Sequence, residues 1–339
     1  GPDGWLYGAT GSTVTSNISS AVTKNLQFDG QGIWRYHPET EIFELFAEGG
    51  GNTFHVEIDA KGRIYSGDNG ANTRGQYYKQ GGYYVKNWGK HGPLTNPHAF
   101  GYLRTMPLEG DALRFTHAWI KYEADLLPDP YLGRLIAINP LLNYLQLSDI
   151  VPNGSTFSTV DVQKVLSTED HWFRPVDIKV GPDGAVYLAD WYDSRLSHID
   201  PADNWHKTSG RIYRIRSEQY EPVPHFDLSR YSDAQLIGLL SHPNKWYRQQ
   251  AIRQFGDRKH QAVIQPLQKI LVDETGQLAL EALWAINISG YFDQHMAKIG
   301  LQHIDPFVRL WTVRLLGDNR SVAPETYPIL YQTTIDERH

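Results

Sequence analysis

The 339-residue sequence contains no cysteine. This absence excludes disulfides, cysteine-based zinc sites, a thiol nucleophile and c-type haem attachment within these residues. Lysine and arginine form no run, and 32 basic against 38 acidic residues leave a net charge of −6, so nucleic acid is not an expected partner. No apolar stretch approaches the roughly 18–20 residues of a membrane span, so we expect no span in this chain.

Hydrophobic residues make up 40% of the chain and aromatic residues 12%, enough to build folded cores. The chain starts at Gly1 without methionine, and Gly1-Pro2-Asp3-Gly4 is a turn sequence that normally follows a strand. We therefore expect a fragment of a longer protein, cut at both ends.

Composition changes near residue 220. Before it, glycine is dense and β-branched and aromatic residues form short runs, whereas leucine, isoleucine, glutamine and alanine dominate after it. Glu221-Pro222-Val223-Pro224 has the composition of a linker, because proline blocks helix continuation. The sequence predicts a β-rich domain over 1–220 and a helical domain over 221–339.

One turn-and-strand pattern occurs three times in the first domain. Each copy is a polar turn ending in Gly4, Gly62 or Gly184, which we expect at positive φ, followed by an alternating strand. These glycines are separated by 58 and 122 positions, against about 40–50 residues for a four-stranded propeller blade. Further strands are predicted at Gly32–Tyr36, Glu41–Ala47, Arg134–Asn139 and Arg211–Ile215.

This repeat favours part of a β-propeller with about three to four four-stranded blades. A β-sandwich is the alternative, but sandwiches seldom repeat one turn-strand sequence. Three or four blades would leave an open sheet edge, which again suggests that N-terminal blades are missing.

The second domain shows helical periodicity from Leu228, with Ser229 and Ser232-Asp233 as candidate helix N-caps. Residues 246–257 align with residues 307–318 at an offset of 61, and 278–290 lies between them with similar spacing of apolar residues. The unit is about 30 residues, a pair of helices. It resembles HEAT-like repeats over residues 228–318; a plain helical bundle is the alternative, and neither implies chemistry.

The first candidate site segment is Glu48–Gly75. Gly49-Gly50-Gly51-Asn52 precedes one strand and Asp68-Asn69-Gly70-Ala71-Asn72 follows the next. Glycine-rich backbone offers carbonyls and amides to a ligand or to a hard cation such as Ca²⁺. Tight turns without a ligand are the alternative.

The second segment is Asp170–Asp193, in which Arg174 precedes Pro175 at the start of an inner strand. An arginine held in extended backbone is well placed to bind a carboxylate in the channel. The alternative is a structural salt bridge with Asp177 or Asp190.

The third segment, Gln76–Tyr102, is rich in tyrosine, tryptophan and glycine, and shows no sustained strand pattern. Such a loop on a propeller face can stack sugars or a planar cofactor. A packing plug is equally consistent with it.

Histidine is abundant, at 14 residues, but His91, His98, His117, His171, His198 and His206 show no helical i, i+4 metal spacing with a carboxylate. The sequence also carries no P-loop, no G-x-S-x-G motif and no dinucleotide-binding glycine pattern in a βαβ context.

The segments GPDGWLYGATGS, GQGIWRYHPET, EGGGNTFHVEIDAKGRIYSGDNG and WFRPVDIKVGPDGAVYLADWYDSRL together resemble membrane-bound dehydrogenase proteins of planctomycete-type bacteria. Their propeller is similar to soluble glucose/sorbosone dehydrogenases, which use pyrroloquinoline quinone (PQQ) with Ca²⁺. The resemblance covers residues 1–216, and helical repeats follow in the same proteins.

The resemblance implies several site residues. Asn52 matches the asparagine of an Arg-Asn pair that contacts the quinone, although Gly51 stands at the arginine position. Gly70 and Ala71 match the backbone carbonyls that hold calcium, and Arg174 matches an arginine that pairs with the quinone carboxylates. The catalytic histidine, a general base toward the sugar carbinol, would lie upstream of Gly1.

The resemblance thus implies a PQQ-dependent sugar or alcohol dehydrogenase, with a sugar or polyol substrate, a cytochrome c domain or other electron acceptor, and a periplasmic or cell-envelope location. Without the base, this fragment is expected to be inactive by itself. One alternative is a non-catalytic propeller that binds glycans or proteins, with the helical repeats as a docking surface. Another is a lyase or hydrolase that uses Asp68 and Asp190.

Overall fold

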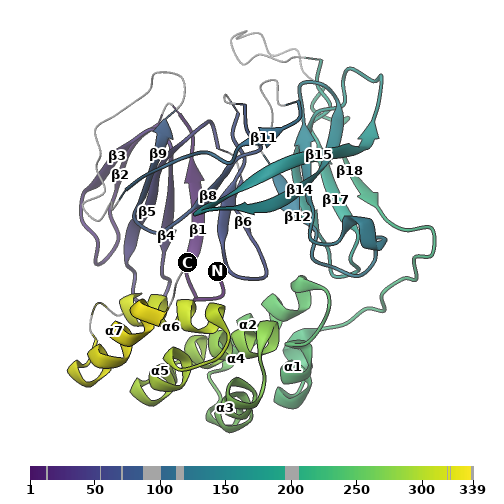
Figure 1. Cartoon of the computed structure of the whole chain (residues 1–339). Coiled ribbons are helices and arrows are strands. Elements are labelled where there is room, and N and C mark those ends of the chain that lie inside the picture. The colour runs from purple at the N-terminus through teal and green to yellow at the C-terminus, as the bar shows by residue number, and fades with distance from the viewer. Residues whose placement is uncertain are drawn as a thin grey trace. The chain divides into compact units, whose positions relative to one another are not determined.

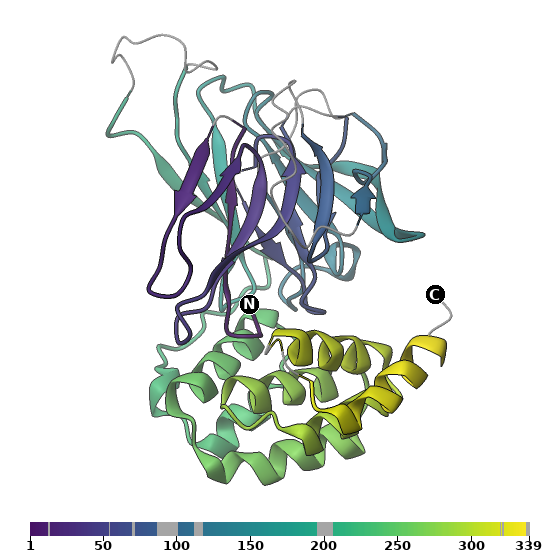
Figure 2. The same ribbon diagram turned by 90° about the vertical axis from the view of Figure 1, so that its left-hand side faces the viewer.

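The computed structural model describes residues 1–12, 14–53, 55–69, 72–86, 101–111, 118–194, 206–318, 320 and 322–336. The chain divides into two compact units. The strand unit is Trp5–Val223, and the helical unit is Pro224–His339 together with Gly1–Gly4. Each is described by itself below, and Figures 1 and 2 show their elements.

The strand unit consists of consecutive small sheets. The first sheet has the order β1 (Leu6–Thr10), β4 (Gly32–Tyr36), β5 (Phe43–Gly50), β9 (Gly82–Lys86) and β10 (Gly101–Leu103), beside a hairpin of β2 (Thr15–Ile18) and β3 (Leu26–Asp29). The second is β6 (Glu57–Ile58), β7 (Ile64–Ser66) and β8 (Gln76–Tyr78). The third is β12 (Trp119–Lys121), β13 (Leu135–Asn139), β14 (Tyr144–Asn153), β15 (Thr156–Ser167) and β11 (Leu108–Glu109). The fourth is β16 (Pro175–Val180), β17 (Val186–Asp190) and β18 (Arg211–Ile215).

The three repeated turns have the predicted backbone. Gly4, Gly62 and Gly184 adopt φ angles of +87°, +69° and +74°, a region that glycine enters without steric cost. Each turn is followed by a strand, namely β1, β7 and β17. The second and third turns also join antiparallel neighbours, β6 to β7 and β16 to β17. The repeated pattern is therefore a local structural repeat.

Three of the sheets pack side by side through one strand each. Strand β12 of the third sheet contacts β6 of the second sheet and β16 of the fourth. Ile120, Ile138, Leu147, Ile178 and Leu188 are buried between the third and fourth sheets. Full burial of each such side chain contributes about 1.5–3 kcal/mol. The described strands form separate small sheets, as in the blades of a propeller, and do not close a ring. Among these sheets, only the third has four consecutive antiparallel strands, as a regular blade has.

The segment Gln76–Tyr102, in which no sustained strand pattern was predicted, contains β8, β9 and the start of β10, so that prediction was wrong there. The reason is tertiary. Tyr78 and Tyr84 are each 1% exposed and pack with ring centroids 4.8 Å apart, and β9 pairs in parallel with the distant β5. These two tyrosines pack in the core of the strand unit. Residues 87–100, with His91 and His98, lie outside the described part of the chain.

The helical unit consists of three helix pairs and a last helix. The helices are α1 (Asp233–Leu239), α2 (Lys245–Arg258), α3 (Ile264–Asp273), α4 (Gly276–Ile288), α5 (Gln294–Leu301), α6 (Pro306–Asp318) and α7 (Tyr327–Asp336). Ser232 caps α1 as predicted, in a reciprocal capping box with Gln235. No helix in the described ranges is long and apolar enough to cross a membrane.

The two segments aligned at an offset of 61 share their contacts. Nη1 of Arg248 donates to the carbonyl oxygens of His242 and Pro243 at 2.6 and 2.9 Å. Nη1 of Arg309 donates to the carbonyls of His303 and Ile304 at 2.7 and 2.8 Å. Each arginine thus ties the start of its helix to the preceding loop, which satisfies carbonyls that would otherwise lack a partner.

Candidate functional site

Polar side chains stand in the strand unit after the ends of β5 and β7, before the start of β16 and at the end of β17. Three groups of residues matter there. They surround Gly51 and Asp68, Arg174 and Asp190, and His55.

Gly51 and Asp68 are in direct contact. A Cβ atom added to Gly51 would lie 1.7 Å from Oδ1 of Asp68, which is far inside van der Waals contact. Asp68 is fully buried, and its Oδ2 accepts a hydrogen bond of 2.9 Å from Nε2 of Gln76. The adjoining Gly50 likewise faces the Tyr78 hydroxyl, 2.3 Å from its Cβ position. These glycines serve close packing, and a carboxylate occupies the place where the resemblance implies an arginine.

Asn52 is half-buried beside this contact. Its Oδ1 lies 2.8 Å from the Cβ position of Gly11, so its amide packs onto the β1–β2 connection. The next residue, Thr53, donates from Oγ1 to the carbonyl of Thr10 at 2.9 Å. Gly70 and Ala71, the predicted calcium ligands, lie outside the described residues.

Arg174 stands immediately before β16 and is 6% exposed. Its backbone N–H donates to Oδ1 of Asp190 at 2.8 Å, and Nη1 donates to the Phe173 carbonyl at 3.0 Å. Nε has no hydrogen-bond partner in the described part of the chain. Burial lowers the pKa of Arg174, and the carboxylates of Asp193, Asp190 and Asp170 oppose that shift only in part.

The alternative prediction for Arg174, a salt bridge with Asp177 or Asp190, was wrong. Asp190 binds backbone amides: its Oδ1 also accepts from Tyr192 N–H at 2.9 Å. Asp177 faces His55. The left-handed backbone of Tyr192, with φ of +53°, lets one carboxylate oxygen accept both amides.

Asp190 retains one unused oxygen. It is 4% exposed, and Oδ2 has no hydrogen-bond partner among the described residues. Beside it, the Trp191 N–H donates to the Arg174 carbonyl at 2.9 Å, while the indole is 48% exposed and donates from Nε1 to Asp193 at 3.2 Å. An unused donor, an unused acceptor and an exposed aromatic ring therefore lie at one end of the fourth sheet.

His55 precedes β6 and was not identified from the sequence. Its Nδ1 is 3.5 Å from Oδ1 of Asp177 and 3.3 Å from Nζ of Lys179. Its Nε2 is 3.7 Å from Oε2 of Glu57, too long for a hydrogen bond. The alternation of side chains along a strand could have indicated this cluster. Residues two positions apart share one face of a strand, as His55 and Glu57 do at the start of β6 and Asp177 and Lys179 do on β16.

Burial lowers the pKa of His55, but its interactions with Asp177 and Glu57 outweigh burial, so the pKa is raised overall despite Lys179. A histidine between two carboxylates on inner strands can hold or release a proton near neutral pH. Across the ranges that the structure describes, no group of three or more His, Asp or Glu side chains could hold a metal ion.

A family model described as "Domain of unknown function (DUF7133)" matches residues 1–219. The chain belongs to the DUF7133 family. Its match covers the whole strand-rich region up to the linker, including Asn52, Asp68, Arg174 and His55. No curated protein matches the DUF7133 chain.

Several solved structures share part of its backbone. An oxidoreductase described as a glucose dehydrogenase from Thermus thermophilus is 20% identical, with a TM-score of 0.43, covering 63% of this chain and 62% of that one. The apo form of the soluble aldose sugar dehydrogenase from Escherichia coli is 15% identical, with a TM-score of 0.37 and coverages of 56% and 58%. A PQQ-bound aldose sugar dehydrogenase from Streptomyces coelicolor is 18% identical, with a TM-score of 0.37 and coverages of 64% and 59%. The DUF7133 chain spans less than two thirds of the length of each.

Proposed function

We propose that the strand unit binds a neutral sugar or polyol where β16 begins and β17 ends. The observation that carries this proposal is the juxtaposition of two buried, unused polar atoms, Nε of Arg174 and Oδ2 of Asp190, beside the exposed indole of Trp191. An alcohol hydroxyl both donates and accepts, so it can satisfy both atoms. The aromatic face suits the apolar face of a sugar ring.

The charges around Arg174 favour a neutral ligand over an anion. Asp170, Asp190 and Asp193 act on its guanidinium, so three carboxylates face one cation. An anionic ligand would be repelled by this surplus of negative charge. Leaving Nε and Oδ2 unsatisfied costs about 1–3 kcal/mol for each atom, which a hydroxyl group would recover.

Oxidation of the bound alcohol with PQQ and Ca²⁺ is the second candidate. It is favoured by the motif resemblance. When bound, PQQ supplies the oxidant for the carbinol. The described residues do not fit it at either predicted contact, because Asp68 fills the arginine position at Gly51 and three carboxylates surround Arg174.

The wider proposal keeps the architecture that the repeats predict. The sheets are blades of a β-propeller, and the helical unit is a HEAT-like array that offers a docking surface. The protein would act in the periplasm or cell envelope. If oxidation takes place, electrons would pass to a cytochrome c domain or another acceptor.

The test is calorimetric titration of the chain with a panel of aldoses and polyols, with and without Ca²⁺ and PQQ. We expect sugar binding without the quinone. We also expect Asp190→Asn and Trp191→Ala to weaken it about tenfold, as for loss of a charge-assisted hydrogen bond or a stacking face. Asp257→Asn, an exposed carboxylate of the helical unit, is the matched control. Absence of binding to any sugar, or equal binding by Asp190→Asn, would contradict the proposal.

A separate arm tests oxidation. The full-length gene product with Ca²⁺ and PQQ should reduce a dye acceptor in the presence of an aldose if the second candidate is right. Sugar binding without quinone binding would support the glycan-binding function and contradict the dehydrogenase function.

A further inference from the structure

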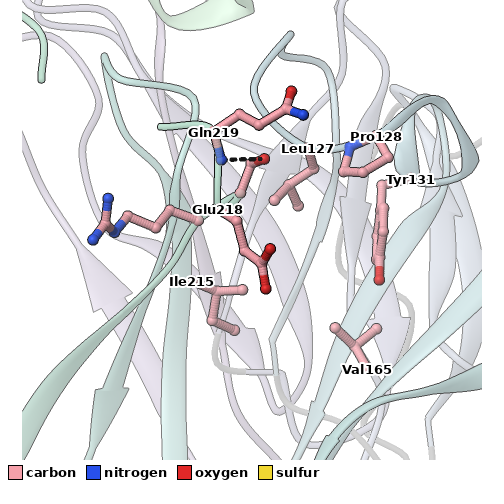
Figure 3. A pocket seen from close by; sticks show the side chains of 9 residues that line it. Leu127, Pro128, Tyr131, Val165, Ile215, Glu218 and Gln219 are labelled. Carbon is pink, nitrogen blue, oxygen red and sulfur yellow. Dashed lines mark hydrogen bonds between the residues drawn. The ribbon is translucent and has the colours of Figure 1, made fainter. Parts of the chain in front are cut away.

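A cavity lies in the strand unit, lined by none of the residues of the candidate site. It has a volume of about 450 Å³. It is lined by Leu127, Pro128, Tyr131, Val165, Ile215, Arg216, Ser217, Glu218 and Gln219 (Figure 3). Its volume falls within the range of small-ligand sites. Three elements meet there: η1 (Asp129–Tyr131) with the residues before it, the C-terminal half of β15, and the chain after β18.

One wall is fixed by a buried tyrosine. The hydroxyl of Tyr122, which is fully buried, accepts from the N–H groups of Leu126 and Leu127 at 3.1 and 2.8 Å and donates to the Gly184 carbonyl at 2.9 Å. The N–H of Tyr131 donates to the Pro128 carbonyl at 2.9 Å. The Leu127–Tyr131 wall is therefore held in place before any ligand arrives.

The opposite wall carries one acidic side chain. Oγ of Ser217 accepts a hydrogen bond of 3.2 Å from the N–H of Gln219, which tightens the turn at residue 218. In Figure 3 the carboxylate of Glu218 points into the cavity, between Ile215 and Tyr131. Glu218 forms no hydrogen bond or ion pair with any described residue.

The neighbouring cations are engaged elsewhere. The guanidinium of Arg216 lies 4.8 Å from the ring centroid of Tyr220, and that of Arg214 lies 4.1 Å from the same ring. Arg214 also pairs with Asp183 at 2.6 Å. Glu218 is thus the one acidic side chain among the described lining residues, and the guanidinium of the lining residue Arg216 lies against Tyr220.

We propose that this cavity binds a primary alkylammonium ion, a cation on a short apolar stem. Leu127, Pro128, Val165 and Ile215 would bury the stem, and the ring of Tyr131 and the carboxylate of Glu218 would receive the cationic head. An anion would meet the carboxylate of Glu218, which repels it. The site is separate from the proposed sugar site, which contains none of these residues.

The probe is n-pentylammonium, titrated into the full chain by calorimetry, with 1-pentanol as the uncharged counterpart of equal length. We expect the amine to bind more tightly than the alcohol. We expect Glu218→Gln to weaken amine binding about three- to tenfold and to leave alcohol binding unchanged, the range for a partly exposed charge pair. Tyr131→Ala should weaken the amine, because it removes the aromatic face.

Glu169→Gln, an exposed carboxylate outside the cavity, is the matched control and should bind like the parent chain. Thermal unfolding of each variant checks that the fold is retained. Equal affinity for amine and alcohol, or an unchanged affinity in Glu218→Gln, would overturn the proposal. Binding of a lysine-containing tripeptide amide without binding of free n-pentylammonium would also overturn it, in favour of a protein partner.

Discussion

The imidazole of His55 faces the carboxylate of Asp177 at 3.5 Å, although the two residues are 122 positions apart in the chain. His55 precedes the inner strand β6, and Asp177 lies on the inner strand β16. The pair therefore links the second and fourth sheets. Its side chains differ in exposure, with 4% of His55 and 51% of Asp177 accessible, so solvent screens the pair in part.

The His55–Asp177 pair should make stability depend on pH. The pKa of His55 is raised from 6.5, so its contribution is complete below that value and is lost as pH rises through the higher folded pKa. The pKa of Asp177 is lowered from 3.8: burial raises it, but the hydrogen bond from His55 and the charge of Lys179 outweigh burial. The contribution of Asp177 is therefore complete above 3.8 and is lost on further acidification.

We expect His55→Gln to lower the free energy of unfolding more at pH 5 than at pH 9, by a difference of about 0.5–1 kcal/mol. Urea unfolding at both pH values measures this difference. Asp177→Asn should reduce the same pH dependence. A cost of His55→Gln that is equal at the two pH values would show that protonated His55 makes no net contribution.

Lys179 should hold the pKa of His55 below the value that the carboxylates alone would set. Its Nζ lies 3.3 Å from Nδ1 of His55, and its charge lowers the histidine pKa. Lys179→Gln is therefore expected to raise the pKa of His55, measured by NMR titration of the ring protons. Lys259→Gln, in the helical unit, should leave it unchanged. A fall in the His55 pKa on Lys179→Gln would contradict this geometry.

The contact between Gly51 and Asp68 predicts a steric cost. Gly51→Ala places a Cβ where Oδ1 of Asp68 lies, so we expect a loss of about 1–3 kcal/mol in the free energy of unfolding. The double variant Gly51→Ala/Asp68→Ala should cost less than the sum of the single changes. Additive costs at positions 51 and 68 would refute the contact.

Gly238 in α1 has open space around its Cβ position. Gly238→Ala should therefore raise the free energy of unfolding by about 0.5–1 kcal/mol.

Arg248 and Arg309 allow a comparison of two equivalent positions. Nε of Arg248 also donates to Oε1 of Glu281 at 2.8 Å, and both side chains are under 10% exposed. Arg248→Gln leaves a buried carboxylate with its cation removed, so we expect a loss of about 3–5 kcal/mol. Arg309→Gln should cost less.

The double variant Arg248→Met/Glu281→Met separates the pair from its packing. Because it removes both charges, it should recover much of the loss seen in Arg248→Gln. Denaturant unfolding of the chain, followed by far-ultraviolet circular dichroism, measures all three. A double variant less stable than Arg248→Gln would show that the ion pair itself stabilises the helical unit.

Local features of the fold were predictable from the sequence. The three turns required glycine at positive φ because residues with a Cβ avoid that region, and Gly4, Gly62 and Gly184 adopt it. The predicted strands Gly32–Tyr36 and Arg211–Ile215 are β4 and β18 within the same bounds. The helical repeat and the Ser232 cap were also encoded in short segments, since both depend on contacts within a few residues.

Contacts across the sheets were decided only by tertiary structure. Strand β9 depends on pairing with the distant β5, and both β8 and β9 depend on burial of Tyr78 and Tyr84, which their local sequence does not signal. The contacts of the candidate site were likewise decided by tertiary structure. The position of Arg174 before an inner strand was readable, but its unused Nε beside Asp190 was not.

By itself, the sequence determined the turns, the helical periodicity and the absence of cysteine chemistry, because these depend on residue type and on neighbours within a turn or two. The tertiary structure alone decided that a carboxylate fills the space beside Gly51 and that His55 meets Asp177. Those contacts join residues 17 and 122 positions apart, and they arise when sheets formed by different segments pack and exclude water from the polar groups between them.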